Sequence, residues 1–191
     1  MAVREQYRIR FLLIITLFSG CSSQLEKGNV MSMKYLNSNS SLLSRYHGDT
    51  YVDGKEFSGR LFSLSSGADT IYACGYSNGK QDGWAFQYYP GGKVAEERFF
   101  AEGRKEGVHK GWWEDGKPKF EYHFENGEHH GELKEWYQSG RLARSFHYRN
   151  GHEEGLQQMW WEDGSVRANY IVKDGEQFGL TGRKRCVNAN L

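Results

Sequence analysis

The sequence predicts an all-β protein, built as a repeat array of antiparallel β-hairpins that form an elongated single-layer sheet. Three observations predict this fold: glycines recur every 24 residues, an aromatic pair recurs with the same step, and the segments between them alternate apolar and polar side chains. Aromatic residues make up 15% of the chain and glycine supplies 24 positions. This composition is typical of turn-rich β-proteins that stack rings, and it argues against a helical core.

The repetition runs through several registers without a slip. The glycine registers are Gly79, Gly103, Gly127, Gly151 and Gly175; Gly83, Gly107, Gly131, Gly155 and Gly179; and Gly92, Gly116, Gly140 and Gly164. The aromatic register is Tyr88-Tyr89, Trp112-Trp113, Trp136-Tyr137 and Trp160-Trp161. This periodicity indicates a repeat domain over residues 51–180, with about five units of which the first is a weaker copy.

Each unit has the pattern of a hairpin. A short segment leads to the aromatic pair, a turn follows at residues 114–117 ("EDGK"), and a second strand alternates through Phe120 and Tyr122. Asp-Gly favours a two-residue hairpin turn in which both central residues adopt positive φ, so we expect that turn here. The Gly-x-x-x-Gly segments, such as residues 127–131, are expected to connect one hairpin to the next.

The N-terminus has the pattern of an export signal over residues 1–20. Three arginines precede an apolar run at residues 11–18 that is too short to span a bilayer as a stable helix. The residues before Cys21 resemble the lipobox of bacterial lipoproteins, which implies lipidation of Cys21 and cleavage before it. Ser22 stands where an aspartate would favour the inner membrane, so we expect a lipid anchor in the outer membrane of a bacterial cell envelope. An ordinary signal peptide with a chance cysteine is the alternative.

Composition and charge describe the rest of the chain. Residues 21–50 are rich in serine and asparagine and are expected to form a flexible tether, and residues 181–191 a basic tail. Removing the signal removes three arginines and one glutamate, so 25 − 3 = 22 basic and 24 − 1 = 23 acidic residues remain. Such a balanced charge makes nucleic acid an unlikely class of partner.

The repeated polar residues do not converge on a catalytic or metal site. The acidic turns Glu114-Asp115 and Glu162-Asp163 are two units apart, which places them ~20 Å from each other and too far apart to cooperate. The histidines His123 and His147 are one unit and therefore ~10 Å apart, too far to share one metal ion. Cys74 and Cys186 are separated by more than four units, so a disulfide between them is not expected. We expect no enzyme activity, no metal and no cofactor.

The aromatic pairs and the histidines are the candidate binding residues. Neighbouring residues of a strand point to opposite faces, so one ring of each pair is expected on the apolar face and the other on the polar face. The candidate residues on the polar face are Tyr88, Trp112, Trp136, Trp160, His123 and His147. The competing interpretation is that both rows of rings only stack within the sheet, because a single layer has no second layer to cover them.

The combined pattern of glycines and aromatic pairs resembles MORN repeats, in the variant form found in bacterial proteins of the YwqK antitoxin family. The resemblance covers roughly residues 51–180. It implies a single-layer meander of antiparallel hairpins, and the ring-lined sheet favours a binding role. We therefore expect a protein-binding or scaffolding module at the cell envelope, held to the membrane by its anchor. The alternatives are an antitoxin-like or immunity inhibitor of a partner protein, and a module that binds a glycan or a lipid headgroup.

Overall fold

The computed structural model describes residues 35–182, which form two β-sheets and no helix. The strands of the large sheet are β1 (Tyr35–Asn37), β5 (Gly59–Leu64), β6 (Thr70–Ser77), β7 (Lys80–Tyr88), β8 (Val94–Ala101), β9 (Arg104–Lys105), β10 (Gly107–Trp112), β11 (Pro118–Glu125), β12 (Glu128–Trp136), β13 (Leu142–Arg149), β14 (His152–Glu153), β15 (Gly155–Trp160), β16 (Val166–Lys173) and β17 (Glu176–Leu180). The small sheet contains β2 (Leu43–Tyr46), β3 (Asp49–Val52) and β4 (Lys55–Glu56). No helix in the described part has the length and hydrophobicity to cross a bilayer.

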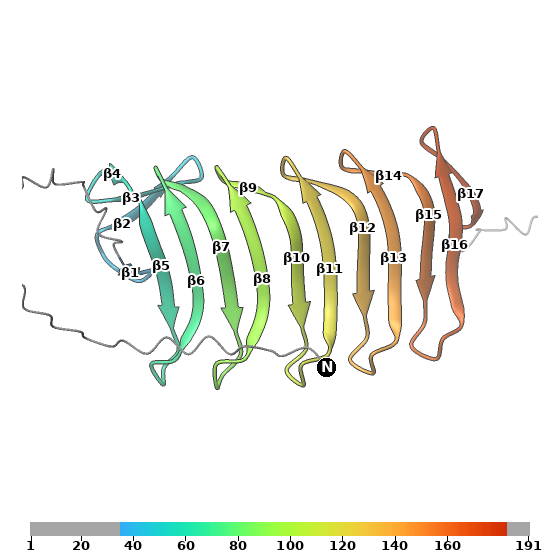
Figure 1. The fold of residues 1–191 in the computed structure, drawn as a ribbon, viewed down its shortest axis with the longest axis horizontal. Coiled ribbons are helices and arrows are strands. Elements are labelled where there is room, and N and C mark those ends of the chain that lie inside the picture. The colour runs from blue at the N-terminus through green and yellow to red at the C-terminus, as the bar shows by residue number, and fades with distance from the viewer. Residues whose placement is uncertain (1–34, 183–191) are drawn as a thin grey trace, which may run out of the picture. The chain divides into compact units, whose positions relative to one another are not determined.

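The large sheet is a meander in which the strands lie side by side in the order of the chain (Figure 1). From β5 onward every paired neighbour is antiparallel, and the parallel pair is β1 with β5. Short strands β9 and β14 extend two of the connections, where they pair with β8 and β13. The predicted all-β array of hairpins is therefore confirmed.

The two ends of the hairpins are closed by different turns, and the predicted assignment of the turn types was wrong. At one end, Trp113 donates its N–H to the Lys117 carbonyl across a three-residue loop, in which only the glycine, Gly116, has a positive φ (86°). At the other end, Asn126 (φ 53°) and Gly127 (φ 91°) form a two-residue turn with positive φ at both positions. The segments expected to be connectors are thus tight hairpin turns followed by strand.

Each unit is bonded to the next at both ends of its hairpin. At the three-residue turns, the second aromatic residue donates to the carbonyl of the first aromatic residue one unit later. These bonds are Tyr89 Oη to Trp112 O (2.9 Å), Trp113 Nε1 to Trp136 O (3.2 Å) and Tyr137 Oη to Trp160 O (2.9 Å). A basic side chain adds a second bond of this kind, for example from Lys117 Nζ to the Gln138 carbonyl at 3.1 Å.

At the two-residue turns a backbone contact is joined by an acidic side chain of the preceding unit, as where Glu106 accepts the Asn126 N–H at 3.0 Å. The glycine of each turn donates its N–H to a carbonyl of the preceding unit, as from Gly127 to Lys105 at 3.0 Å and from Gly151 to His129 at 2.9 Å. A Cβ built on Gly127 would lie 3.6 Å from the Arg104 Cβ, an ordinary van der Waals distance, so the positive φ rather than crowding favours glycine here. The first glycine register therefore serves both the turn and the stacking of units.

The two faces of the large sheet differ in burial. We call the buried one the core face. Its buried residues are Leu61, Cys74, Ala85, Phe100, His109, Phe120, Phe124, Leu133, Phe146, Gln157, Ala168, Tyr170 and Val172. The opposite face, here the outer face, carries Glu97, Lys110, Glu121, Lys134, Ser145 and Gln158 directly opposite one another on successive strands. The core face is thus mainly hydrophobic, with the ion pairs Glu96–Arg98 and Glu135–Arg144 among its half-buried side chains, and the middle of the outer face is charged.

The segment 35–50, expected to be part of the tether, contains β1, β2 and the beginning of β3. Leu36 and Leu43 pack against a buried cluster of Val52, Phe57 and Leu61. The polar residues that suggested a tether close the turn between the first two strands, where the side chains of Asn37 and Ser40 accept backbone N–H groups. Serine and asparagine mark turns here as well as tethers, which is why composition misplaced this boundary. The predicted signal, Cys21 and the tail from residue 183 lie outside the described residues.

Candidate binding face

The second ring of each aromatic pair has a structural role that the hydrogen bonds make specific. Tyr89, Trp113 and Tyr137 are half-buried, and each donates to the backbone of the following unit. All three residues carry an O–H or N–H donor, which phenylalanine lacks. The last pair differs, because Trp161 is 50% exposed and contacts the Arg167 guanidinium at 4.5 Å from its ring centroid.

The first ring of each pair lies on the outer face, with the two candidate histidines. Strand alternation places Tyr88, Trp112, Trp136 and Trp160 on the same side as Phe86, Lys110, Lys134 and Gln158. His123 and His147 face Val108 and Glu132 on the neighbouring strands, on the same side. The four rings are half-buried, and His147 is exposed. The structure therefore brings all six candidate residues to one face, with the rings nearer the three-residue turns and the histidines nearer the two-residue turns.

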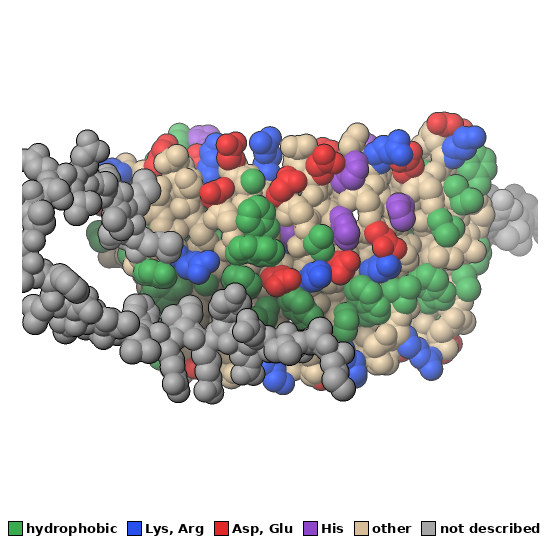
Figure 2. Space-filling view, in the orientation of Figure 1, with side chains coloured by type: hydrophobic (Ala, Val, Ile, Leu, Met, Phe, Trp, Pro, Cys, Tyr) green, Lys and Arg blue, Asp and Glu red, His purple; other side chains and the backbone are tan. Residues whose placement is uncertain are grey.

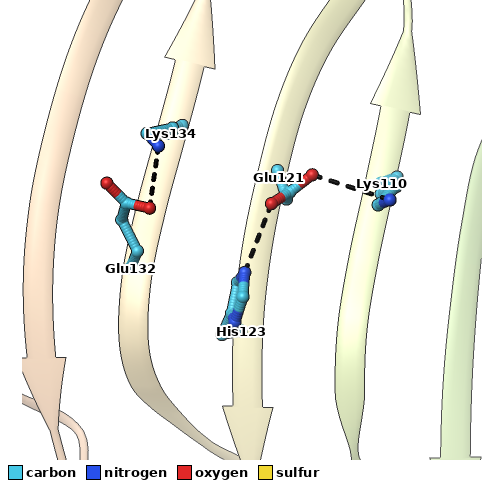
Figure 3. A network of polar contacts seen from close by, with 5 residues as sticks. All are labelled: Lys110, Glu121, His123, Glu132 and Lys134. Atoms are coloured by element: carbon cyan, nitrogen blue, oxygen red, sulfur yellow. Dashed lines mark hydrogen bonds and ion pairs between the residues drawn. The ribbon is translucent and has the colours of Figure 1, made fainter.

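Charged side chains separate the rings from the histidines. Lys110 Nζ lies 3.7 Å from Glu121, whose other oxygen lies 3.3 Å from His123 Nε2, and Lys134 Nζ lies 2.8 Å from Glu132 (Figure 3). Figure 2 shows this band of alternating acidic and basic side chains, with hydrophobic side chains gathered below it. The alternating signs cancel locally, so the band gives the face specific hydrogen-bonding positions without a strong field of one sign.

The structure adds an aromatic cluster that the sequence analysis did not include. Trp84, Phe86 and Tyr88 follow one another on the outer side of β7, with ring centroids 6.1 and 6.2 Å apart and interplanar angles of 23° and 30°. Phe99 of β8 contacts Trp84 edge-on at 5.2 Å. Trp84 is 45% exposed. The alternating pattern W-x-F-x-Y at 84–88 indicates this row of rings in the sequence. It occurs in one unit, so it is not one of the repeated registers.

A second exposed apolar patch lies at the other end of the sheet. Leu156, Ile171 and Phe178 are directly opposite one another on β15, β16 and β17, and each is about half exposed. The equivalent positions in the middle units are polar, with His123, Glu132 and His147 among them. The outer face is thus apolar at both ends and charged in its middle.

The buried polar residues of the core face are structural. His109 is 1% exposed, and its Nε2 donates to the Phe99 carbonyl at 2.8 Å. Burial lowers the pKa of His109, and the nearby cations of Arg98 and Lys105 lower it further. Gln157 stands two units later and donates to the His147 carbonyl in the same way, at 2.9 Å.

The acidic turns stabilise their own loops. Asp115 accepts the N–H of Lys117 at 3.1 Å, and Asp163 accepts that of Ser165 at 2.7 Å. The bond from the Lys117 N–H lowers the pKa of Asp115 below its ordinary value. The pKa of Asp163 is lowered first by a bond from the Ser165 hydroxyl, at 2.6 Å, and then by the Ser165 N–H. Within residues 35–182, no three His, Cys, Asp or Glu side chains gather as a metal site would require.

Cys74 is a buried free thiol, and burial raises its pKa. Its Sγ donates to the Gly75 carbonyl at 3.3 Å, so the thiol is enclosed in the core rather than presented for reaction. Cys186, the other cysteine considered for a bridge, lies outside the described residues.

Comparison with known proteins adds one finding to this geometry. No curated protein matches the chain. Two consecutive units, residues 105–126 and 130–150, match a family described as MORN repeat variant. MORN repeats are non-catalytic modules that often take part in protein or membrane binding. The matched residues include strands β10 to β13. The repeat array therefore contains MORN-variant repeats.

Proposed function

We propose that the chain is a non-catalytic module that binds or scaffolds a protein partner through the outer face. The observation that carries the proposal is the arrangement of that face, where four half-buried rings, a band of paired charges and two histidines lie in parallel rows. Interfaces are often rich in aromatic residues, surrounded by polar groups that provide specificity. Several polar groups of the core face, such as His109 and Gln157, bond to the backbone within the fold, whereas the outer face presents its rings, paired charges and histidines together.

We also propose that this module is held at a bacterial cell envelope by a lipid on Cys21, in the outer membrane. The support is the lipobox-like sequence, and several acyl chains on one residue anchor stably. Labelled palmitate should be incorporated into the full chain and not into a Cys21→Ala variant. Incorporation that persists in Cys21→Ala would contradict lipidation at this residue.

Partner binding is tested by capture from cell envelopes with the full chain and with a Trp112→Ala/Trp136→Ala double variant. We expect a partner retained by the unchanged chain to be lost from the double variant, while circular dichroism shows the same β-sheet content. A Glu114→Ala variant, altered at an exposed turn, is the matched control and should retain the partner. Equal capture by all three chains would contradict a role for the rings. Capture of a toxin-like enzyme would favour the inhibitor interpretation within the same binding role.

A glycan is the second candidate ligand, and the row of Trp84, Phe86 and Tyr88 favours it. Rings in a row on an exposed strand offer flat apolar surfaces on which the C–H faces of sugars pack. Binding of envelope polysaccharide that is lost in Trp84→Ala but kept in Trp112→Ala/Trp136→Ala would separate this function from protein binding.

A further inference from the structure

One position recurs at the centre of each unit on the core face, and its occupants differ in size. The occupants are Ala85, His109, Leu133 and Gln157, at steps of 24 residues. All four are buried. In three units a medium or large side chain fills this position, with His109 and Gln157 also bonding to backbone carbonyls. Alanine leaves the first of these four units without that filling.

A cavity of about 300 Å³ lies beside Ala85. The register explains its walls: Ala85 is opposite Arg98, Gln87 is opposite Tyr72 and Glu96, and Gly83, which has no side chain, is opposite Phe100. The lining includes Tyr72, Gln81, Gln87, Arg98, Phe100 and Lys105. Its volume is at the lower limit of pockets that hold small molecules, which begin at about 300 Å³.

The charges around the cavity sum to one excess positive charge. Arg98 NH2 is paired with Glu96 at 2.5 Å, whereas the Arg98 Nε is buried and without a hydrogen-bond partner in the described part of the chain. Lys105 Nζ lies 4.8 Å from the centre of the Phe124 ring, and none of the described carboxylates pairs with it. A buried N–H donor without a partner is costly, and an oxyanion placed beside it would remove that cost.

The neutral walls indicate what the rest of a ligand would resemble. Phe100 and Ala85 provide an apolar surface, while the amide of Gln81 donates to the Tyr72 hydroxyl at 3.3 Å. Burial raises the pKa of the Tyr72 hydroxyl, so it stays protonated and able to donate a hydrogen bond. One anionic group, a compact apolar body and room for one hydroxyl fit this combination.

We propose that the cavity beside Ala85 binds a small aromatic or aliphatic carboxylic acid, with its carboxylate on Arg98 and Lys105 and its apolar body against Phe100. This site lies on the core face and is independent of partner binding through the outer face. The larger residues at the equivalent positions of the other units occupy the space that Ala85 leaves open. The binding site is thus a departure from the repeat rather than a property of it.

In the test, benzoate, 4-hydroxybenzoate and butyrate are titrated into the full chain by calorimetry. Benzyl alcohol serves as a probe without a charge, and inorganic phosphate as an anion without an apolar part. We expect at least one acid to bind with a Kd on the order of 1 mM or tighter, as a ligand of this size allows. Arg98→Gln should weaken that acid at least about tenfold, since it removes a charge-assisted bond. Arg104→Gln, which removes an exposed charge from the neighbouring residue of β9, should leave it unchanged.

Ala85→Leu reproduces the residue of the third unit and should abolish binding by filling the cavity. If Ala85→Leu does not fold, as judged by circular dichroism, Arg98→Gln and Lys105→Gln decide the question alone. Binding that survives in a folded Ala85→Leu chain would overturn the proposal, as would equal binding of benzyl alcohol. Binding of phosphate without any of the acids would also overturn it, and so would the failure of every acid to bind.

Discussion

The two ends of each hairpin join the units by different means. At the three-residue turns the joints are side chains, since Trp113 bonds to a carbonyl 23 residues ahead. At the two-residue turns the backbone makes the main contact, since the Gly127 N–H donates to a carbonyl 22 residues behind. There the Glu106 carboxylate also accepts the Asn126 N–H, at 3.0 Å. The first joint accepts tyrosine or tryptophan because either supplies a donor at the required reach. The second favours glycine because the backbone of its turn residue has a positive φ.

The largest effect is expected from removing an interior side-chain joint. Trp113→Ala loses the bond to Trp136 O and the packing of a half-buried indole, and should lower the free energy of unfolding by about 3 kcal/mol. Trp161→Ala is the matched change at the last pair, where the ring is 50% exposed, and should cost less than half as much. Urea unfolding followed by circular dichroism measures both. Equal losses of unfolding free energy would show that the hydrogen bond from Trp113 to the next unit adds little stability.

The backbone joint should be the next most sensitive. Gly127→Ala places a Cβ on a residue with φ of 91° beside Arg104 and should cost about 1–2 kcal/mol in unfolding free energy. Asn126→Gly in the same turn keeps the positive φ without a side chain and should be near neutral. A neutral Gly127→Ala variant would show that the turn can relax away from the preceding unit.

The buried residue His109, which lies between the two ends of its hairpin, should make the stability of the fold depend on pH. Burial lowers its pKa in the folded state, so the unfolded chain binds the proton more readily. The stability that neutral His109 provides is full above its unfolded pKa of about 6.5 and is lost as pH falls through the lower folded pKa. Unfolding measured from pH 8 to pH 4 should show a smaller loss on acidification in His109→Leu than in the unchanged chain.

Part of the pH dependence of stability should remain in His109→Leu, because burial also lowers the pKa of His129. His147→Gln, which removes an exposed histidine from the outer face, is the control for the loss of a histidine as such. A profile in which His109→Leu matches the unchanged chain would contradict the role of the buried imidazole.

The smallest effect is expected from the second bond at the three-residue turns. Lys117→Met removes the exposed bond from Nζ to the Gln138 carbonyl and the ion pair with Asp115 at 3.0 Å. Exposed charged contacts of this kind contribute about 0.5 kcal/mol, so the unfolding midpoint should move only slightly. A loss of unfolding free energy as large as that of Trp113→Ala would contradict the weaker contribution expected of the Lys117 bond.

The sequence was sufficient for the period, the fold class and the face of the first rings, because these follow from alternation and spacing alone. The turn types were predicted wrongly, although Asn126-Gly127 and Asn150-Gly151 are strong two-residue turn signals. Asp115-Gly116 carries a similar signal, and only the pairing of Trp113 with Lys117 shows that its loop has three residues.

The cavity beside Ala85 illustrates a second limit. Aligning the units brings Ala85, His109, Leu133 and Gln157 into one column, and the small residue stands out there. The aligned units do not show which residues face one another on neighbouring strands. Only this register places Arg98 and Phe100 around the alanine. Tertiary contacts decide which departures from a repeat create space and which are absorbed by neighbours.

The hydrogen bonds between units join residues at fixed separations along the chain, and this has an evolutionary consequence. Bonds that span 21, 22 and 23 residues are satisfied together only when every unit keeps the same length. A single-residue insertion would displace them on both sides, whereas duplication of a whole 24-residue unit would reproduce every one of them. Homologues of this chain should therefore change length in whole steps, by gain or loss of complete units, with single-residue gaps confined to loop tips.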